Sequence, residues 1–186
     1  MMEDYKGELW GKAFAWQIKG ASVEEVWAVT GNFLEVDKWA TSLVKSCELV
    51  KGEPQMPGCV RKVVLFPTAP GEPFTIALEK LTEMDVLQHC YSYTMLEGST
   101  MPGFSLMQDY NSTFKLSSPV DDRPRNQGGT SSATLLHWSF VCRPISTLSK
   151  EQSQQIAFSL YQAAVDELKA RLSLPTDSIS LLSNVE

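Results

Sequence analysis

The chain has 186 residues, of which 43% are hydrophobic and 20% charged, and this composition is typical of an ordinary globular domain rather than a disordered chain. A chain of this length is expected to form a single domain. The formal net charge is −6 at pH 7, whereas non-specific binding to nucleic acid or to an anionic membrane requires a basic surface. We therefore expect neither a nucleic-acid partner nor a membrane partner.

Two features of the sequence bear on where the protein works. The N-terminal residues contain no apolar stretch typical of a secretory signal, and no window approaches the roughly 18 consecutive apolar residues of a membrane-spanning helix. The four cysteines are widely spaced, without a CxxC pair, and each lies among apolar residues: Cys47, Cys59, Cys90 and Cys142. Buried, reduced thiols are typical of a reducing compartment, so we expect a cytoplasmic protein.

The first predicted element is a strand. Large side chains alternate with small ones over residues 8–19, which predicts a strand that curves over a core. Ser22 then precedes two glutamates at the positions of a first helical turn, which is typical of an N-cap and predicts a short helix. Gly31 ends this helix, and a second short helix is expected over residues 32–38.

After this helical pair the hydrophobic pattern changes to a period of two, which is typical of half-buried strands. Residues 82–85 connect two such strands and are few enough for a hairpin. Residues 117–131 form a long polar segment, which we expect to be a mobile loop. The strands predicted in this part of the chain span residues 44–50, 59–66, 74–81, 86–95, 106–116 and 133–143.

A long amphipathic helix is predicted over residues 149–172, where apolar side chains recur every four residues. Ser149 and Gln152 have the spacing of a capping box at its start. Pro175 ends the pattern, and residues 176–186 are expected to form a frayed, disordered tail. The apolar stripe consists of Ile156, Leu160, Ala164, Leu168 and Leu172, widened by Phe158, Ala163 and Val165.

This order of elements predicts an α+β fold in residues 1–175. Strands joined by short turns pair largely antiparallel, so the seven strands are expected to form one curved antiparallel sheet. A single long helix can lie across the concave face of such a sheet. Because one helix cannot fill the whole concave side, we expect an apolar cavity between sheet and helix, and this cavity is the natural place for a site.

The sequence lacks the common motifs of nucleotide-dependent and metal-dependent enzymes. It has no Walker loop, no GxGxxG, no HExxH and no GxSxG. Its two histidines are His89 and His137, and a zinc site would require them to converge with distant cysteines. A catalytic triad has no local support in the sequence. We therefore expect neither a metal nor another cofactor.

Two charged residues stand in strands that otherwise have the composition of a core. Arg61 shares its face of the 59–66 strand with apolar residues, and Glu79 does the same in the 74–81 strand. If both faces line the cavity, an arginine and a carboxylate meet in a medium of low dielectric constant, which is costly unless each satisfies the other or a ligand. Two further interpretations stay open: a plain structural salt bridge, or a register that places one charge outside.

Five short segments, taken in order, are similar to those of a known family: Cys47–Glu53, Gly58–Arg61, Glu79–Leu81, Tyr91–Tyr93 and Trp138–Phe140. On these segments the chain resembles the plant lachrymatory factor synthases and their relatives, over about residues 9–172. That family has the helix-grip fold of the Bet v 1/START-like superfamily, also described as polyketide cyclase-like or SRPBCC. The resemblance therefore implies a sheet wrapped around a long C-terminal helix, with two short helices after the first strand.

The resemblance also implies a chemistry. It makes Arg61 and Glu79 the catalytic pair, and it makes Tyr93, Tyr110 and Trp138 the substrate-binding residues of an apolar pocket. The family reaction moves a proton in an alkenyl sulfenic acid from oxygen to carbon, which gives a thial S-oxide and requires no cofactor. A carboxylate can carry that proton, and a guanidinium can hold the developing oxyanion. The expected ligand is small and hydrophobic or sulfur-containing.

Three other functions fit the same residues. The first is a carrier or sensor of an apolar plant metabolite, in which Arg61 or Glu79 anchors one polar group of the ligand. The second is a cyclase that applies the same acid–base chemistry to another substrate. The third is an interaction protein whose own side chains fill the cavity. The sequence departs from the family pattern at residues 66–73 and 117–131, where a pocket mouth is expected, and it predicts no oligomeric state.

Overall fold

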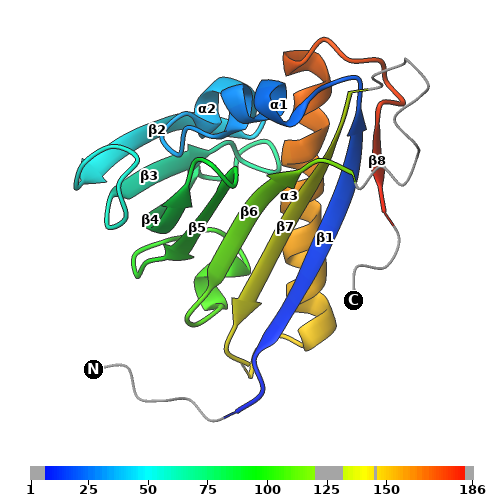
Figure 1. Cartoon of the computed structure of the whole chain (residues 1–186). Helices are drawn as coiled ribbons and strands as arrows, with labels where there is room; N and C mark the ends of the chain where they lie inside the picture. The colour runs from blue at the N-terminus through cyan, green and yellow to red at the C-terminus, as the bar shows by residue number, and fades with distance from the viewer. Residues whose placement is uncertain (1–6, 120–131, 145, 183–186) are drawn as a thin grey trace.

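A curved sheet wraps around a long helix in the computed structural model, which describes residues 7–119, 132–144 and 146–182 (Figure 1). Within these residues the strands are β1 (Trp10–Lys19), β2 (Val44–Lys51), β3 (Val60–Leu65), β4 (Thr75–Asp85), β5 (Cys90–Met95), β6 (Asn111–Ser117), β7 (Ala133–Cys142) and β8 (Ile179–Leu181). The helices are α1 (Val23–Thr30), α2 (Val36–Trp39), the 3-10 helix η1 (Phe104–Leu106) and α3 (Lys150–Arg171).

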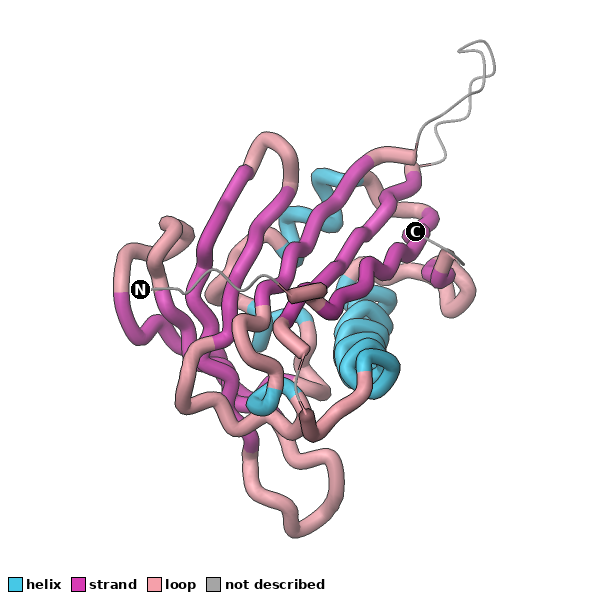
Figure 2. The backbone as a smooth tube through the Cα atoms, turned by 90° about the horizontal axis from the view of Figure 1, so that it is seen from below, coloured by secondary structure: helices cyan, strands magenta, loops and turns pink. Residues whose placement is uncertain are grey.

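The sheet has the strand order β2-β3-β4-β5-β6-β7-β1-β8, and each neighbouring pair is antiparallel. Strands β2 to β7 therefore form an antiparallel meander, as predicted, although the connections β5–β6 and β6–β7 are long. α1 and α2 carry the chain from β1 to β2 across the upper end of the molecule (Figure 1). Figure 2 shows α3 nearly end-on, on one side of the curved sheet. The predicted α+β architecture, an antiparallel sheet with a long C-terminal helix, is confirmed.

The predicted starts of the first and last helices are confirmed, whereas α2 begins at Val36 and not at residue 32. Ser22 caps α1, where its hydroxyl accepts a hydrogen bond from the backbone of Glu25 and the Glu25 carboxylate accepts one from the backbone of Ser22. Ser149 and Gln152 form the same reciprocal box at the start of α3. Each box satisfies two backbone N–H groups that the helix itself leaves unpaired, and an N-cap side chain stabilises a helix by about 1 kcal/mol.

The face of α3 that packs against the sheet is shifted from the predicted stripe. Tyr161 and several small side chains lie there, since the sheet presents Trp16 and Trp138 to this side of the helix. Ala164, Val165 and Leu168 of the predicted stripe are buried, as predicted. The buried residues are Ser153, Ala157, Tyr161, Ala164, Val165 and Leu168. The stripe residues Ile156, Phe158, Leu160, Ala163 and Leu172 are only partly buried.

The hairpin between β4 and β5 lies further along the chain than the sequence predicts. β4 runs through residues 82–85 and the turn follows them, so the predicted position of the turn is wrong. The Asp85 carboxylate accepts a hydrogen bond from the backbone N–H of Gln88 (2.9 Å), and this side chain thereby stabilises the turn. Val86 and Leu87, which the hydrophobic pattern assigns to a strand, are 59% and 88% exposed in this turn.

The connection between β5 and β6 is a long loop of residues 96–110, called the 96–110 loop below. The strand expected from residue 106 begins only at Asn111, because Phe104–Leu106 form η1 instead. Gly103 precedes η1 with a φ angle of 80°. A Cβ atom at Gly103 would lie 2.6 Å from Cδ1 of Ile156, so the loop packs too closely on α3 for a larger residue.

The C-terminal segment contains a strand where the sequence predicts a frayed tail. β8 pairs with β1, with Leu181 opposite Trp16, and gives the described part of the sheet an eighth strand. The tail predicted over residues 176–186 is therefore ordered at residues 179–181. Residues 183–186 lie outside the described residues, and so do residues 120–131 of the predicted mobile loop.

Two further findings concern the helices and the cysteines. None of the helices within the described residues is both long and apolar enough to cross a membrane. The four cysteines are free thiols, with Cys59 and Cys142 buried and Cys47 and Cys90 half-buried. Free thiols are what the spacing of the cysteines predicts.

Candidate functional site

Arg61 and Glu79 face each other directly across β3 and β4. The strand register pairs the two residues, and the alternation of the strands turns both side chains to the inside. Arg61 is 5% exposed and Glu79 is 7% exposed. The structure therefore places both predicted charges in the interior, and the interpretation that one of them lies outside is wrong.

The two side chains form a short, buried ion pair. Nε of Arg61 donates to Oε2 of Glu79 at 2.6 Å, and Nη2 of Arg61 lies 2.6 Å from the same oxygen. Nη1 of Arg61 donates to the backbone carbonyl of Phe33. A buried charge is tolerated only when it is paired and its remaining hydrogen-bonding groups are satisfied. These contacts give each of the three guanidinium nitrogens a partner.

Aromatic rings surround the guanidinium. Its carbon atom Cζ lies 3.8 Å from the centre of the Phe33 ring and 5.6 Å from the centre of the Tyr93 ring. The segment that carries Phe33 is held by Gln55, which accepts a hydrogen bond from the Phe33 N–H (2.9 Å) and donates one to the Gly31 carbonyl (3.0 Å). Phe33 thus contributes both a ring and a carbonyl to the site.

The electrostatics keep Arg61 charged and its neighbour Cys47 neutral. Burial alone would lower the pKa of the Arg61 guanidinium, but the adjacent Glu79 carboxylate raises this pKa, and the net change is upward. Burial raises the pKa of the Cys47 thiol to about 11, although the positive charge of Arg61 opposes this change. Cys47 is therefore a protonated thiol near the ion pair and not a thiolate nucleophile.

A second polar group lies deeper in the interior and consists of the hydroxyls of Tyr110, Ser112 and Tyr161, called the hydroxyl cluster below. The Tyr161 hydroxyl is hydrogen-bonded to the Tyr110 hydroxyl and lies 2.9 Å from Oγ of Ser112. Ser112 also accepts a hydrogen bond from Nε1 of Trp138 (3.0 Å) and donates one to the Ser139 carbonyl (2.9 Å). The cluster joins β6, β7 and α3.

These contacts fix the direction of the hydrogen bonds. Ser112 has one proton, which goes to the Ser139 carbonyl, so Tyr161 must donate to Ser112. Tyr161 then accepts the proton of Tyr110. The ring of Tyr161 stacks on Trp138 with 4.2 Å between ring centroids and an angle of 7° between planes, which holds it in place.

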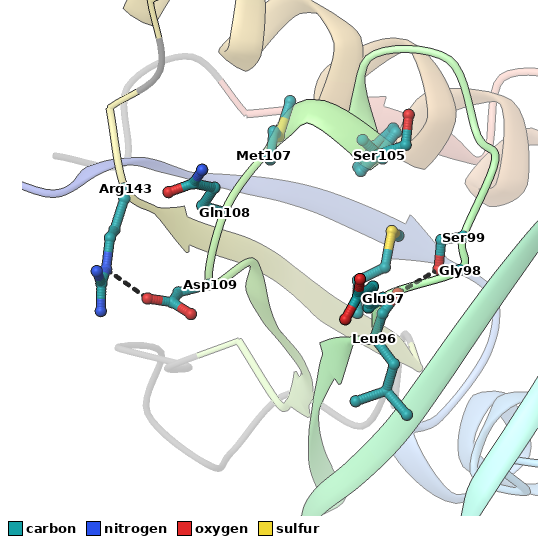
Figure 3. Close-up of a pocket in the computed structure, with 11 residues that line it drawn as sticks. Leu96, Glu97, Gly98, Ser99, Ser105, Met107, Gln108, Asp109 and Arg143 are labelled. Atoms are coloured by element: carbon teal, nitrogen blue, oxygen red, sulfur yellow. Dashed lines mark hydrogen bonds and ion pairs between the residues drawn. The ribbon is translucent and has the colours of Figure 1, made fainter. Parts of the chain in front are cut away.

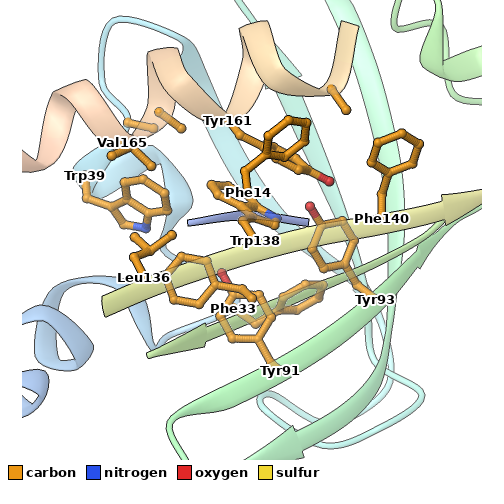
Figure 4. Close-up of a cluster of buried hydrophobic side chains, with 14 of the residues drawn as sticks. Phe14, Phe33, Trp39, Tyr91, Tyr93, Leu136, Trp138, Phe140, Tyr161 and Val165 are labelled. Atoms are coloured by element: carbon orange, nitrogen blue, oxygen red, sulfur yellow. The ribbon is translucent and has the colours of Figure 1, made fainter. Parts of the chain in front are cut away.

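Tyr93 lies between the ion pair and the hydroxyl cluster. Its ring neighbours the Arg61 guanidinium, and Figure 4 shows its hydroxyl and that of Tyr161 pointing toward one another. Burial raises the pKa of the Tyr93 hydroxyl well above its ordinary value, and Tyr161 and Glu79 raise it further. Burial likewise raises the pKa of Tyr110. Both phenols therefore stay protonated, and the Tyr110 proton is donated to Tyr161.

The five predicted site residues are thus all buried in one interior, where Tyr93 lies beside the ion pair and Trp138 is hydrogen-bonded to the hydroxyl cluster. Tyr161 and Ser112 belong to the same arrangement, and the sequence analysis missed them. A signal for Tyr161 existed, because a phenol at helical spacing from apolar residues must find a hydrogen-bond partner when it is buried. Ser112 carries no comparable signal.

Within the described residues, no group of three or more His, Cys, Asp or Glu side chains is arranged to hold a metal ion. His89 contacts the ring of Trp27 edge-on. His137 lies opposite Lys115 across β6 and β7. The described part of the chain thus gives no donor set for a zinc ion at either histidine.

A pocket of about 900 Å³ opens beside this interior, within the 96–110 loop (Figure 3). Its floor is apolar and includes Met95, Phe104 and Met107. Its rim carries charged groups, among them Glu97 and the ion pair of Asp109 with Arg143. The predicted site residues are not among those that line this pocket, so sequence reasoning missed it. The cavity predicted between sheet and helix stays a prediction.

The architecture has counterparts among solved structures. Ginseng major latex-like protein 151 from Panax ginseng superposes with a TM-score of 0.65 at 14% identity, over 89% of this chain and 98% of that chain. An uncharacterised protein from Bacillus thuringiensis has a TM-score of 0.64 at 20% identity, over 87% and 97% of the two chains. A protein from Nitrosospira multiformis has a TM-score of 0.62 at 22% identity, over 88% and 94%.

These likenesses define the class of the protein: it has the Bet v 1-like helix-grip fold, as the sequence predicts. Residues 16–173 match the family described as polyketide cyclase / dehydrase and lipid transport, and the chain belongs to this family. The fold is therefore a cyclase-like, ligand-binding fold with a paired Arg61 and Glu79 in its interior.

Proposed function

We propose that the protein is a cofactor-independent isomerase of the lachrymatory factor synthase type, which converts an alkenyl sulfenic acid into a thial S-oxide. The observation that carries this proposal is the ion pair of Arg61 and Glu79, buried among aromatic rings. The sequence resemblance to that family supports it at the same two positions. A pair of charges is costly in such a place, and a substrate that needs both of them gives a reason for it.

The reaction moves one proton and requires no oxidant or reductant. Glu79 takes the proton from the sulfenic oxygen and returns it to the distal carbon of the double bond, while the C–S bond gains double-bond character. Oε2 of Glu79 is occupied by Nε and Nη2 of Arg61, so Oε1 is the atom that we assign to the proton transfer. Atoms and charge balance, since the same proton leaves oxygen and arrives at carbon.

We assign to Arg61 the role of stabilising the negative charge that develops on the substrate oxygen. Its pKa is raised, so it stays protonated throughout and cannot be the proton shuttle. A fixed guanidinium in an interior of low dielectric constant stabilises an oxyanion more strongly than water does. Tyr93 and Tyr110, both protonated, orient the substrate, and Trp138 forms an apolar wall.

Turnover of an alkenyl sulfenic acid generated in situ tests these roles in Arg61→Leu and Glu79→Gln. Each substitution is expected to lower kcat by roughly 10²- to 10³-fold or more, the usual contribution of an oxyanion donor or a general acid–base group. Glu83→Gln removes an exposed carboxylate from the same strand as Glu79 and is expected to keep wild-type turnover. Wild-type turnover in folded Arg61→Leu and Glu79→Gln would refute the assignment.

A carrier of a small hydrophobic metabolite is the second candidate, and the pocket of about 900 Å³ together with the lipid-transport part of the family description favours it. Native mass spectrometry of the purified protein would then detect a co-purified ligand.

A cyclase with another substrate would use the same pair of charges. The free thiols favour a reducing compartment such as the cytoplasm for each of these functions.

A further inference from the structure

The pocket in the 96–110 loop adjoins the Arg61–Glu79 pair through one side chain. Met95 stands directly opposite Glu79 in the pairing of β5 with β4, and the alternation of β5 turns it to the inside, like Tyr93. Met95 packs against the buried core and also lines the pocket. Met95 is therefore the residue that connects the pocket lining to the strand position opposite Glu79.

The rest of the floor reaches the hydroxyl cluster. The Phe104 ring contacts the Tyr110 ring edge-on, with 5.2 Å between centroids. Phe104 and Met107 are both buried in the core and both line the pocket. The floor thus consists of side chains, two of them methionines, whose unbranched chains change conformation at low cost.

The walls of the pocket are fixed, in contrast to its floor. The first limb of the 96–110 loop is hydrogen-bonded to β4, from the Leu96 N–H to the Leu78 carbonyl and from the Thr100 N–H to the Ile76 carbonyl, both at 2.7 Å. The loop then packs on α3 at Gly103. The pocket thus has walls held by hydrogen bonds, and its apolar side chains lie beside the strands that carry the buried charged pair. This arrangement suits an outer compartment of the same site.

We propose that this pocket is the outer compartment of the same site and holds the non-reacting tail of an amphipathic substrate, whose sulfur–oxygen group lies at Arg61 and Glu79. This proposal rests on the proposed function and names its substrate class. The pocket is lined by none of the predicted site residues, so a substrate that reaches it from Arg61 and Glu79 carries a chain longer than a three-carbon alkenyl group. The chain lies over Met95, Phe104 and Met107, and a polar end reaches the charged rim at Asp109 and Arg143.

Binding of a homologous probe series tests the proposal without any turnover. The probes are alkyl methyl sulfoxides from propyl to nonyl, whose neutral S–O group can accept a hydrogen bond from Arg61, and the dissociation constants are measured by calorimetry. Each added methylene that enters the pocket is expected to tighten binding roughly threefold to fourfold, the value of one buried methylene.

Two matched variants locate the tail. Ser105 is an exposed residue that lines the pocket, so Ser105→Trp fills the pocket from its rim and is expected to abolish the gain in affinity with chain length. Ser159 is exposed on α3 and does not line the pocket, so Ser159→Trp is expected to keep the wild-type gain. Circular dichroism checks that both variants fold.

Constant affinity along the series in the wild type would overturn the proposal, and so would an equal gain in wild type and Ser105→Trp. Failure of the proposed function has a different signature. If the length dependence is found and then lost in Ser105→Trp, but the wild type does not isomerise any sulfenic acid, the outer compartment stands as a binding site and only the reaction is refuted.

Discussion

The interior charges Arg61 and Glu79 depend on each other. Removal of an ion from water costs several kcal/mol, and only a close partner and full hydrogen bonding return that free energy. Arg61 has a close partner in one oxygen of Glu79 and donates a further hydrogen bond to the carbonyl of Phe33. The pair as a whole therefore contributes little to stability, whereas either charge alone would destabilise the protein.

This dependence predicts a strongly non-additive pair of substitutions. Arg61→Met and Glu79→Leu are each expected to lower the free energy of unfolding by about 3–5 kcal/mol, because each leaves one buried charge unpaired. The double variant is expected to lose far less than the sum of the two. Urea unfolding of the four proteins measures the coupling, and a double-variant loss equal to the sum would contradict it.

The sequence predicted the ion pair but not the hydroxyl cluster, and the reason is physical. A charge in an apolar strand conflicts with its surroundings, so Arg61 and Glu79 are visible in the sequence alone. Ser112 conflicts with nothing, since serine occurs in strands in many settings, and the phenol of Tyr161 indicates only that it needs a hydrogen-bond partner and not which one. Their roles depend on the distance between β6 and α3, which only the packing of the whole fold determines.

At the scale of single elements, Tyr161 joins α3 to the sheet by hydrogen bonds as well as by packing. Its hydroxyl accepts the proton of Tyr110 and donates to Ser112. Tyr161→Phe is expected to lower the free energy of unfolding by about 1–3 kcal/mol, because it leaves the buried Tyr110 hydroxyl without its acceptor.

The same substitution in a Tyr110→Phe background is the control for this prediction. In that background Tyr161→Phe is expected to lower the free energy of unfolding by less, since the Tyr110 hydroxyl that would lose its acceptor is absent. Thermal unfolding followed by circular dichroism gives both differences. Equal losses in the two backgrounds would show that the hydrogen bond between the two tyrosines contributes nothing.

The 96–110 loop depends on a glycine at its contact with α3. Gly103→Ala is expected to lower the free energy of unfolding by about 1–3 kcal/mol, because the φ angle of 80° strains any other residue and the added Cβ would lie 2.6 Å from Ile156. Gly71→Ala is the matched control, since Gly71 has a φ angle of 87° but no atom within 4 Å of an added Cβ. Denaturant unfolding that gives equal losses for the two variants would contradict the role of the contact.

Element boundaries were predictable where a side chain marks them. Ser22 and Ser149 locate the starts of α1 and α3, because a capping hydroxyl has a fixed place relative to the first helical turn. The β4–β5 turn was misplaced because its exposed residues Val86 and Leu87 are apolar, and the hydrophobic pattern alone cannot separate an apolar turn from a strand.

At the scale of the whole molecule, the fold brings the two polar groups into one interior. β3 and β4 carry the ion pair, β6 and α3 carry the hydroxyl cluster, and β5 lies between them with Tyr93. The alternation of apolar and polar side chains predicted which side of each strand faces inward, and the predicted meander gave the order of these strands in the sheet. The sequence did not predict the pairing of β1 with β7 and β8, which involves residues far apart in the chain.

The direct test of the central claim is to run the isomerisation of an alkenyl sulfenic acid in D₂O. The quantity to determine is the configuration at the carbon atom that takes up deuterium. If Glu79 delivers the proton from its fixed place beside Arg61, the carbon that receives deuterium has one configuration in excess with the wild type, and the excess is lost in Glu79→Gln. NMR of a chiral derivative measures the ratio. Equal amounts of the two configurations with the wild type, at the rate of the uncatalysed reaction, would contradict proton transfer by Glu79.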